Sequence, residues 1–203
     1  YRIVFVPETI GAITYLFINN INSLKKNIIG GYVITCVGDN GKFTYLQTRK
    51  ENQLIDKITL FSLKDSKEDY KVRSYIDCGS DERQYNYPGI DLNIGSLMKT
   101  KYLEFDEYHT SGDDLNYISD SSLKKSLEMY KKCLFVIEKN CKYLVTTLCE
   151  PCLSIHGLWD KVGGTKNVND KSLFVKILYY CDGNYDIIDI CNKLNRSFND
   201  VIN

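Results

Sequence analysis

The sequence predicts an α/β protein, with a mostly parallel sheet flanked by helices and a small winged-helix-like α domain after it. In the first part of the chain, apolar and β-branched runs such as RIVFV (2–6) and YVITCVG (32–38) alternate with amphipathic segments. This alternation is the β-α-β order of a parallel sheet. After Cys141 the pattern changes to short helical stretches separated by turns. We therefore expect two domains, covering 1–145 and 146–203.

The first domain is expected to alternate strands with helices. Pro7 and Gly11 interrupt the chain after RIVFV, and the apolar residues of 12–24 fall close to one helical stripe. The further expected elements are strands at 32–38, 43–49, 71–79 and 92–98 and a helix over 52–63. Ser119 and Asp120 are expected to cap a long helix over 121–140. The expected core positions of this helix are Leu123, Leu127, Cys133, Leu134 and Ile137.

The second domain is expected to begin with a connector. Residues 149–170 are rich in Gly, Pro, Asn and Cys. Helical patterns then cover 172–180 and 186–194, and Ser197 is placed to cap a third helix. Three short helices with a turn before the last resemble the front half of a winged helix.

Charge argues against a nucleic-acid partner. Lys plus Arg and Asp plus Glu both number 26, so the chain has no basic excess. The charged residues in the winged-helix stretch include Lys176, Lys193 and Arg196 against Asp182, Asp186, Asp189 and Asp200. Because a surface that follows phosphates needs a basic excess, we expect packing or protein contact instead of DNA binding.

Composition also bears on location. The longest apolar run, 1–18, is broken by Arg2, Pro7, Glu8 and Gly11, so it lacks the ~20 uninterrupted apolar residues of a membrane span. Eight cysteines at irregular spacing are typical of reduced, mostly buried thiols. We therefore expect a cytoplasmic protein that does not bind membranes.

Candidate site residues follow the expected strands. In parallel sheets, functional side chains gather beyond the carboxyl ends of strands, where Glu8, Asp81 and Glu82 are placed. His109 lies among acids and hydroxyls in EFDEYHTSGD, and an imidazole beside carboxylates is a preferred ligand for zinc. We expect Glu8, Asp81 and His109 to meet at one rim of the sheet. Two simpler interpretations stay open: Glu8 could cap a helix, and the acids before Arg83 could form a solvated ion-pair cluster.

Three strings carry a resemblance to a known family. FVPETIGAITYL, GSDERQYNYPGIDL and EYHTSGDDL, in this order and spacing, resemble an uncharacterised bacterial family with a zinc aminopeptidase-like domain. Genes of this family often lie beside surface-polysaccharide genes. The C-terminal stretch looks like the winged-helix domain that follows the catalytic domain in that family. The resemblance covers most of the chain.

The resemblance implies roles for particular residues. His109 matches the metal ligand of a Tyr-His-Thr segment. Glu8 lies where the wider superfamily often has two adjacent glutamates, one a ligand and one the general base, and we assign Glu8 as the base. Asp81 matches a Ser-Asp pair and would bind metal or orient His109. A further carboxylate ligand is expected near Cys36 or Asp39, in a register that the sequence leaves open.

The resemblance also implies that the chain is incomplete. In that superfamily the first ligands, a histidine and an aspartate, lie upstream of the matched strings. We expect this chain to be the C-terminal portion of a longer zinc-dependent hydrolase of peptides or related amides, with an incomplete site and no activity alone. Its expected partner is the missing N-terminal half, and a homo-oligomer stays open. The alternative is a non-catalytic assembly or regulatory module in surface-polysaccharide biosynthesis.

One more motif lies in the connector. Cys149 and Cys152 form a C-x-x-C pair, with Cys141 upstream and His156 downstream. Cysteine and histidine are the ligands of structural zinc, so a zinc knuckle is one interpretation. The spacing fits no common zinc finger, and the other interpretation is a set of buried thiols around the connector.

Overall fold

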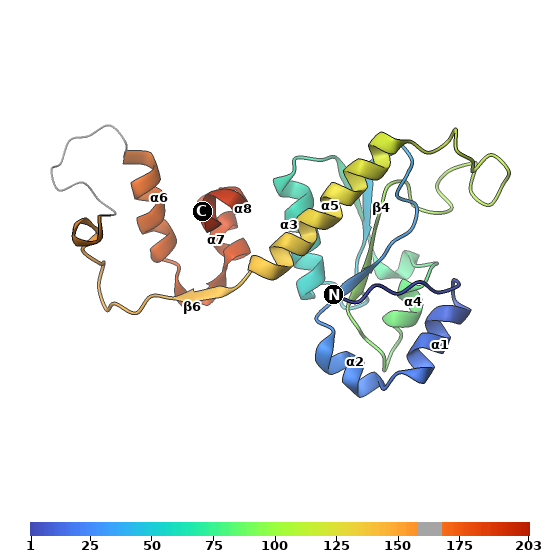
Figure 1. Cartoon of the computed structure of the whole chain (residues 1–203), viewed down its shortest axis with the longest axis horizontal. Helices are drawn as coiled ribbons and strands as arrows, with labels where there is room; N and C mark the ends of the chain where they lie inside the picture. Colours follow the sequence, from blue (N-terminus) through green and yellow to red (C-terminus); the bar gives the residue numbers. More distant parts are fainter. Residues whose placement is uncertain (158–167) are drawn as a thin grey trace. The chain divides into compact units, whose positions relative to one another are not determined.

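The structure is a computed structural model that describes residues 1–157 and 168–203 (Figure 1). Residues 158–167, within the expected connector, lie outside the described part. The chain forms two compact units, Tyr1–Ile137 and Glu138–Asn203. The sequence analysis placed this division between 145 and 146.

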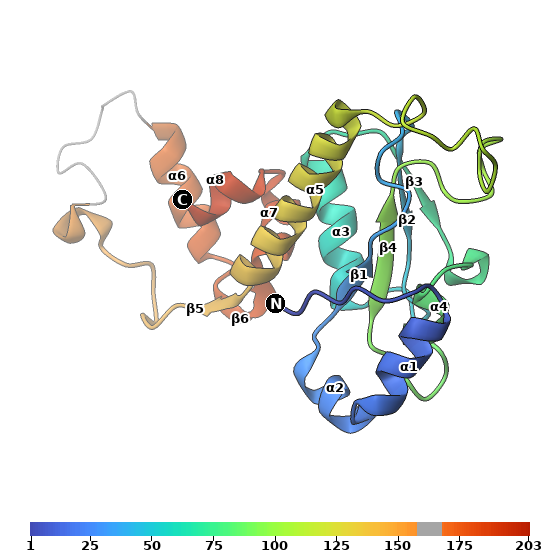
Figure 2. The ribbon, with the colours of Figure 1, turned by 45° about the vertical axis from the view of Figure 1, so that its right-hand side comes forward.

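The first unit is built on a four-stranded mixed sheet (Figure 2). Its strands are β1 Gly31–Val33, β2 Phe43–Leu46, β3 Tyr70–Arg73 and β4 Ile94–Met98. They lie in the order β1-β4-β2-β3. The β1–β4 and β2–β3 pairs are parallel, and the β2–β4 pair is antiparallel. The predicted α/β class with a mostly parallel sheet is therefore confirmed.

Helices and loops cover both faces of this sheet. The helical segments of the unit are α1 Ile10–Ile18, α2 Ile21–Asn27, α3 Leu54–Asp65, the 3-10 helix η1 Tyr75–Asp77, α4 Glu82–Tyr85 and α5 Asp120–Lys139. Helices α3 and α5 share one face (Figure 2), where Tyr32 of β1 bonds to Thr59 at 2.7 Å and packs edge-on against Tyr130. On the other face, Leu46 and Met98 pack against Tyr102 of the loop after β4. The candidate site lies on this second face.

Asp56 fixes α3 against the sheet. Its carboxylate, 1% exposed, accepts hydrogen bonds from Tyr45 Oη at 2.8 Å, Thr48 N at 2.9 Å and Thr48 Oγ1 at 2.6 Å. It also accepts from Gln53 N at 2.9 Å, which completes a capping box. A buried carboxylate is tolerated only when donors satisfy its oxygens, and these four do so.

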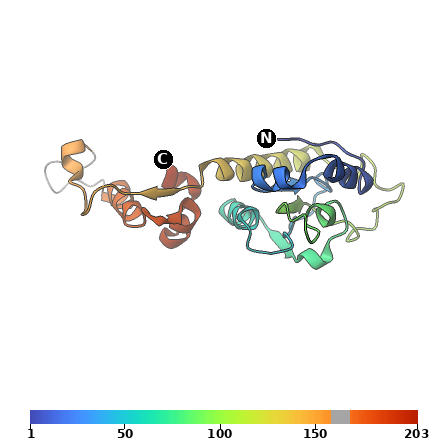
Figure 3. The ribbon, with the colours of Figure 1, turned by 90° about the horizontal axis from the view of Figure 1, so that it is seen from below.

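The predicted first strand is wrong. Residues 1–7 form an extended segment that leads into α1 (Figure 3), and they join no sheet in the part of the chain that the structure describes. Ile3 and Phe5 are 80% and 94% exposed. An apolar, β-branched run favours extended backbone, but a strand also needs a neighbour to satisfy its N–H and C=O groups.

The long helix α5 begins where predicted, but its buried face differs. Ser119 caps it, since Ser119 Oγ accepts from Ser122 N at 3.2 Å. Leu123 and Leu127 are 40% and 57% exposed, so two of the expected core positions are wrong. At this end the buried positions are Ser122 and Ser126. Their hydroxyls donate to Asn40 Oδ1 at 2.8 Å and Val37 O at 2.7 Å, which holds the helix by polar contacts that hydrophobic periodicity does not reveal.

The second unit contains the predicted winged-helix elements. Its elements are β5 Lys142–Leu144, η2 Leu153–His156, α6 Val168–Leu178, β6 Asp182–Asp186, α7 Ile187–Leu194 and α8 Phe198–Ile202. Asp186 and Ser197 each close a capping box at the start of α7 and α8. Strands β5 and β6 pair in antiparallel fashion, although the sequence pattern predicted only helices in this unit. Within residues 1–157 and 168–203, no helix combines the length and apolar character needed to span a bilayer.

Candidate functional site

A strained turn places Glu8 beside Asp81. Thr9 has φ 60° and ψ −67°, and Ile10 N donates to Glu8 O at 2.7 Å, so residues 8–10 form a γ-turn with positive φ at its centre. Positive φ is unfavourable for a β-branched residue, and such strain persists only where the surroundings enforce it. Two contacts do so here: Thr9 N donates to Asp81 Oδ1 at 2.6 Å, and Arg83 Nη2 donates to Thr9 Oγ1 at 2.9 Å.

Asp81 is a buried carboxylate close to other negative charges. It is 9% exposed and directly precedes α4. Burial raises the pKa of its carboxyl above the ordinary value, the Thr9 N–H lowers it, and the charges of Glu8 and Glu82 raise it again. Glu8 is exposed. The turn at Thr9 thus links Asp81, through a hydrogen bond, to the residue that follows Glu8. We call Glu8 and Asp81 the carboxylate pair; Asp81 is buried and Glu8 is exposed.

Glu82 has a different role from its neighbour. Its side chain is fully buried, and Oε1 accepts from Gly79 N and Ser80 N at 2.9 Å and from Tyr102 Oη at 2.7 Å. Oε2 accepts from Ser96 Oγ at 3.2 Å. Glu82 therefore anchors the turn before α4 to the sheet, which fixes Asp81 in place. The interpretation of this acidic segment as a solvated ion-pair cluster is not supported.

His109 lies in the loop after β4, apart from the carboxylate pair. Its backbone has φ 58°, its side chain is exposed, and its ring stacks on Tyr108 with centroids 3.9 Å apart. Burial raises the pKa of the Tyr108 hydroxyl, and the charge of Glu8 raises it further. Across the described ranges, no three His, Cys, Asp or Glu side chains lie close enough together to hold a metal ion. His109 is thus not part of a three-ligand set with Glu8 and Asp81.

Asp39, the other acid considered, is part of a turn. It is 5% exposed, and its carboxylate accepts from Gly41 N at 2.7 Å, Thr100 Oγ1 at 2.6 Å and Thr100 N at 3.1 Å. These donors join the turn after β1 to the end of β4. Cys36, the alternative in that register, has φ 47°, and burial raises the pKa of its thiol.

Comparison with known proteins agrees with this architecture. The family described as "Domain of unknown function (DUF4910)" matches residues 1–140, and a winged helix-turn-helix family matches residues 141–203. The chain belongs to the DUF4910 family.

Two similar proteins come from Clostridium acetobutylicum. One, named "Putative polysaccharide biosynthesis protein with aminopeptidase-like domain", is 40% identical over 200 residues, which are 98% of this chain and 45% of that protein. The other is a crystal structure of a "putative peptidase", with 37% identity, a TM-score of 0.82 and coverage of 96% of this chain and 43% of that chain. The predicted resemblance to an aminopeptidase-like family with a winged helix is confirmed. The chain spans less than half the length of these two relatives.

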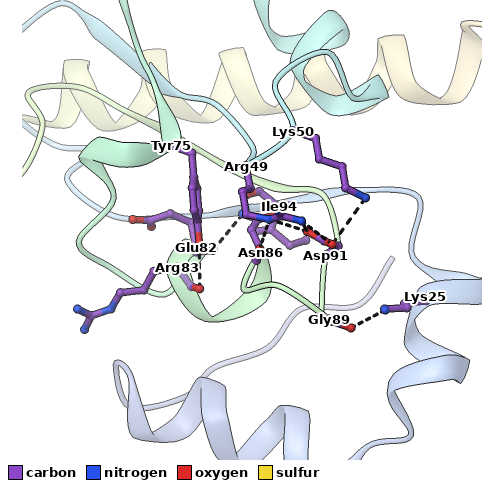
Figure 4. Close-up of polar contacts among 10 residues, drawn as sticks. All are labelled: Lys25, Arg49, Lys50, Tyr75, Glu82, Arg83, Asn86, Gly89, Asp91 and Ile94. Carbon is purple, nitrogen blue, oxygen red and sulfur yellow. Dashed lines mark hydrogen bonds and ion pairs between the residues drawn. The ribbon is translucent and has the colours of Figure 1, made fainter.

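The first unit also contains a polar cluster that the sequence did not predict (Figure 4). Arg49 binds both carboxylate oxygens of Asp91, at 2.7 and 2.8 Å, and its Nε donates to Asn86 O at 3.1 Å. The Asn86 side chain accepts from Ile94 N at 3.0 Å and donates to Glu82 O at 3.0 Å. These contacts hold the loop between α4 and β4. No local pattern marks Arg49, because its partners lie about forty residues away in the sequence.

Proposed function

We propose that this chain is part of a zinc-dependent, aminopeptidase-like hydrolase that acts on a peptide or related amide. The observation that carries the proposal is the Glu8–Asp81 carboxylate pair, held by the γ-turn at Thr9. Strained backbone of this kind is concentrated at functional sites. The names of the two relatives, an aminopeptidase-like domain and a peptidase, support the same reaction class.

Each residue receives a role from its surroundings. Glu8 is exposed and can take up a proton at its carboxylate, so we assign it as the general base. Burial raises the pKa of the Asp81 carboxyl, and the charges of Glu8 and Glu82 raise it further. A bound cation would favour the charged form of this carboxyl, so we assign Asp81 as a ligand. His109 is exposed on a neighbouring loop and supplies an imidazole. Zinc, when bound, lowers the pKa of water and polarises a carbonyl group.

The donor set fits zinc only in part. Carboxylate and imidazole are the right ligand types, but the described residues form no group of three at a shared position. Because the relatives are more than twice as long as the aligned region, we propose that further ligands come from additional polypeptide. On this proposal, the 203-residue chain alone is inactive.

An exposed apolar surface supports such a partner. The strongly exposed apolar side chains of residues 1–18, here called the N-terminal apolar surface, are Tyr1 at 83%, Ile3 at 80%, Phe5 at 94%, Ile10 at 69%, Phe17 at 88% and Ile18 at 72% exposure. Concentrations of large exposed apolar side chains mark interaction sites in soluble proteins. We propose that polypeptide equivalent to the rest of the relatives' length covers this surface. A second copy of the chain is the competing occupant.

The winged-helix unit favours protein contact over DNA. Lys193 lies over the rings of Tyr180 and Tyr185 at 5.3 and 4.4 Å from their centroids. Helix α8 begins at a capping box closed by Asp200 and carries no Lys or Arg. A phosphate-binding surface needs Lys and Arg side chains that are free to contact phosphates. We propose a cytoplasmic protein without a nucleic-acid partner, in keeping with eight free cysteines.

Metal analysis of the longer natural protein tests the hydrolase proposal. We expect close to stoichiometric zinc in the wild type and its loss in His109→Ala. His156→Ala is the matched control, because His156 is the only other histidine, and it should retain zinc. A folded wild type without zinc would instead favour the alternative, a non-catalytic module in surface-polysaccharide biosynthesis, which the name of one relative also suggests. Loss of zinc only in His156→Ala would place the metal in the second unit and contradict our site.

A further inference from the structure

The eight cysteines fall into distinct classes of exposure. Cys133, Cys181 and Cys191 are buried, Cys36 and Cys78 are half-buried, and Cys141, Cys149 and Cys152 are exposed. All three exposed thiols belong to the second unit. The interpretation of the C-x-x-C pair as buried thiols is therefore wrong. The zinc-knuckle interpretation stays a prediction, because the side chain of His156 lies outside the described part of the structure.

Cys152 has the surroundings of a reactive thiol. It directly precedes η2, and its Sγ lies 3.3 Å from Ser154 Oγ. The hydrogen bond from Ser154 lowers the pKa of the Cys152 thiol, and the backbone N–H of Ile155 lowers it further. Burial has the opposite effect at Cys133 and Cys181, whose thiol pKa values it raises. Since the thiolate is the nucleophile, Cys152 is better prepared to react than Cys133 and Cys181.

Cys149 is the cysteine nearest to Cys152 in the sequence. Two residues separate it from Cys152, the chain bends at 147–149, and Cys149 is exposed. The C-x-x-C spacing is the one that dithiol–disulfide oxidoreductases use. Between the two cysteines, the Glu150 carboxylate accepts from Tyr179 Oη at 2.9 Å. The segment between the cysteines is thereby tied to the residue that follows α6.

We propose that Cys149 and Cys152 form a reversible dithiol–disulfide pair that exchanges with small or protein disulfides. The Cys152 thiolate attacks one sulfur of the external disulfide, forms a mixed disulfide and releases the first thiol. Cys149 then loses its proton and attacks Sγ of Cys152, which releases the second thiol. The pair loses two electrons and two protons, and the external disulfide is reduced to two thiols. This site is independent of Glu8, Asp81 and His109.

The proposal is tested with the 203-residue chain, oxidised glutathione and mass spectrometry of the intact chain and its peptides. We expect the wild type to lose two hydrogens, with the new disulfide joining Cys149 to Cys152. Cys149→Ser should accumulate a glutathione adduct on Cys152, because the second step is blocked. Cys152→Ser should react about tenfold more slowly, because the thiol with the lowered pKa is gone. Cys141→Ser is the matched control, an exposed cysteine of the same unit outside the pair, and it should behave like the wild type.

Two results would overturn the proposal. A wild-type chain that keeps its glutathione adduct and forms no internal disulfide would show that the two cysteines cannot reach each other. A disulfide that includes Cys141 would assign the redox chemistry to a different pair. The three substituted positions are exposed, so unfolding of the variants does not confuse either outcome.

Discussion

At the scale of single residues, two adjacent acids of one motif have opposite roles. Glu82 is fully buried and accepts four hydrogen bonds, so its oxygens are committed to the fold. Asp81 accepts from Thr9 N through Oδ1 and lies beside the charge of Glu8. The string GSDERQ predicted an acidic site but could not separate these roles. The separation depends on Tyr102 and Ser96, which come from distant parts of the sequence.

The raised pKa of Asp81 predicts how stability changes with pH. Because the folded-state pKa is above the ordinary value of about 3.9, the folded chain holds this proton more tightly than the unfolded chain. At low pH, Asp81 is protonated in both the folded and the unfolded chain, so its titration does not change the free energy of unfolding. The free energy of unfolding falls as the pH rises from about 3.9 through the raised pKa. Asp81→Asn keeps an oxygen for Thr9 N and removes the charge. We expect it to be more stable than the wild type at pH 7 and equal to it near pH 3.

Urea unfolding of the metal-free chain across this pH range measures the effect. Asp77→Asn is the control, because Asp77 is an exposed aspartate four residues before Asp81, and it should leave the curve unchanged. If Asp81→Asn is less stable than the wild type at pH 7, the charge of Asp81 is stabilising in the folded state and our description of the carboxylate pair is wrong.

At the scale of elements, the sequence predicted those whose signals are local. Helix α3 falls within two residues of its predicted span, and α8 begins at the predicted cap Ser197. Asp186, predicted as the first residue of a helix, is the N-cap of α7. Strands β2 and β4 also lie inside their predicted runs. The wrong predictions concern contacts between residues that are distant in the sequence. Residues 2–6 would form a strand only if a neighbouring strand paired with them. The buried face of α5 is set by Asn40 and the carbonyl of Val37, which no periodicity encodes.

The buried face of α5 gives a matched pair of substitutions. Met129 and Leu127 are two residues apart, but Met129 is 5% exposed and Leu127 is 57% exposed. Met129→Ala should leave a cavity and reduce the free energy of unfolding by about 2–5 kcal/mol. Leu127→Ala should change it by no more than about 0.5 kcal/mol. Hydrogen exchange at the amides of β2 and β4 reports the stability of the first unit separately. If both variants reduce the free energy of unfolding equally, the buried face of α5 differs from the one described.

At the scale of the whole molecule, the first unit exposes apolar side chains that further polypeptide could cover. The N-terminal apolar surface and an extended apolar segment outside any described sheet occur in the same unit as the carboxylate pair. The sequence predicted a longer protein from the resemblance to its family. The structure adds the physical reason why further polypeptide would bind: burial of this surface stabilises association by roughly 25 cal/mol per Å² of apolar area removed from water.

A pair of equally exposed residues tests which surface is covered. Phe17 of α1 is 88% exposed and belongs to the N-terminal apolar surface, whereas Leu115, in the loop before α5, is 85% exposed and does not. We expect Phe17→Ser to weaken co-purification of this chain with polypeptide that corresponds to the rest of the relatives' length, because it removes a large apolar contact. Leu115→Ser should have no effect.

The same two variants separate the possible occupants. Light scattering after gel filtration should find the chain alone to be a monomer, because the proposed occupant is different polypeptide. A dimer of the chain that Phe17→Ser dissociates and Leu115→Ser preserves would assign the surface to a second copy instead. If co-purification depends on Leu115 and not on Phe17, the partner binds the loop before α5, and the exposed side chains of α1 have no role in completing the site.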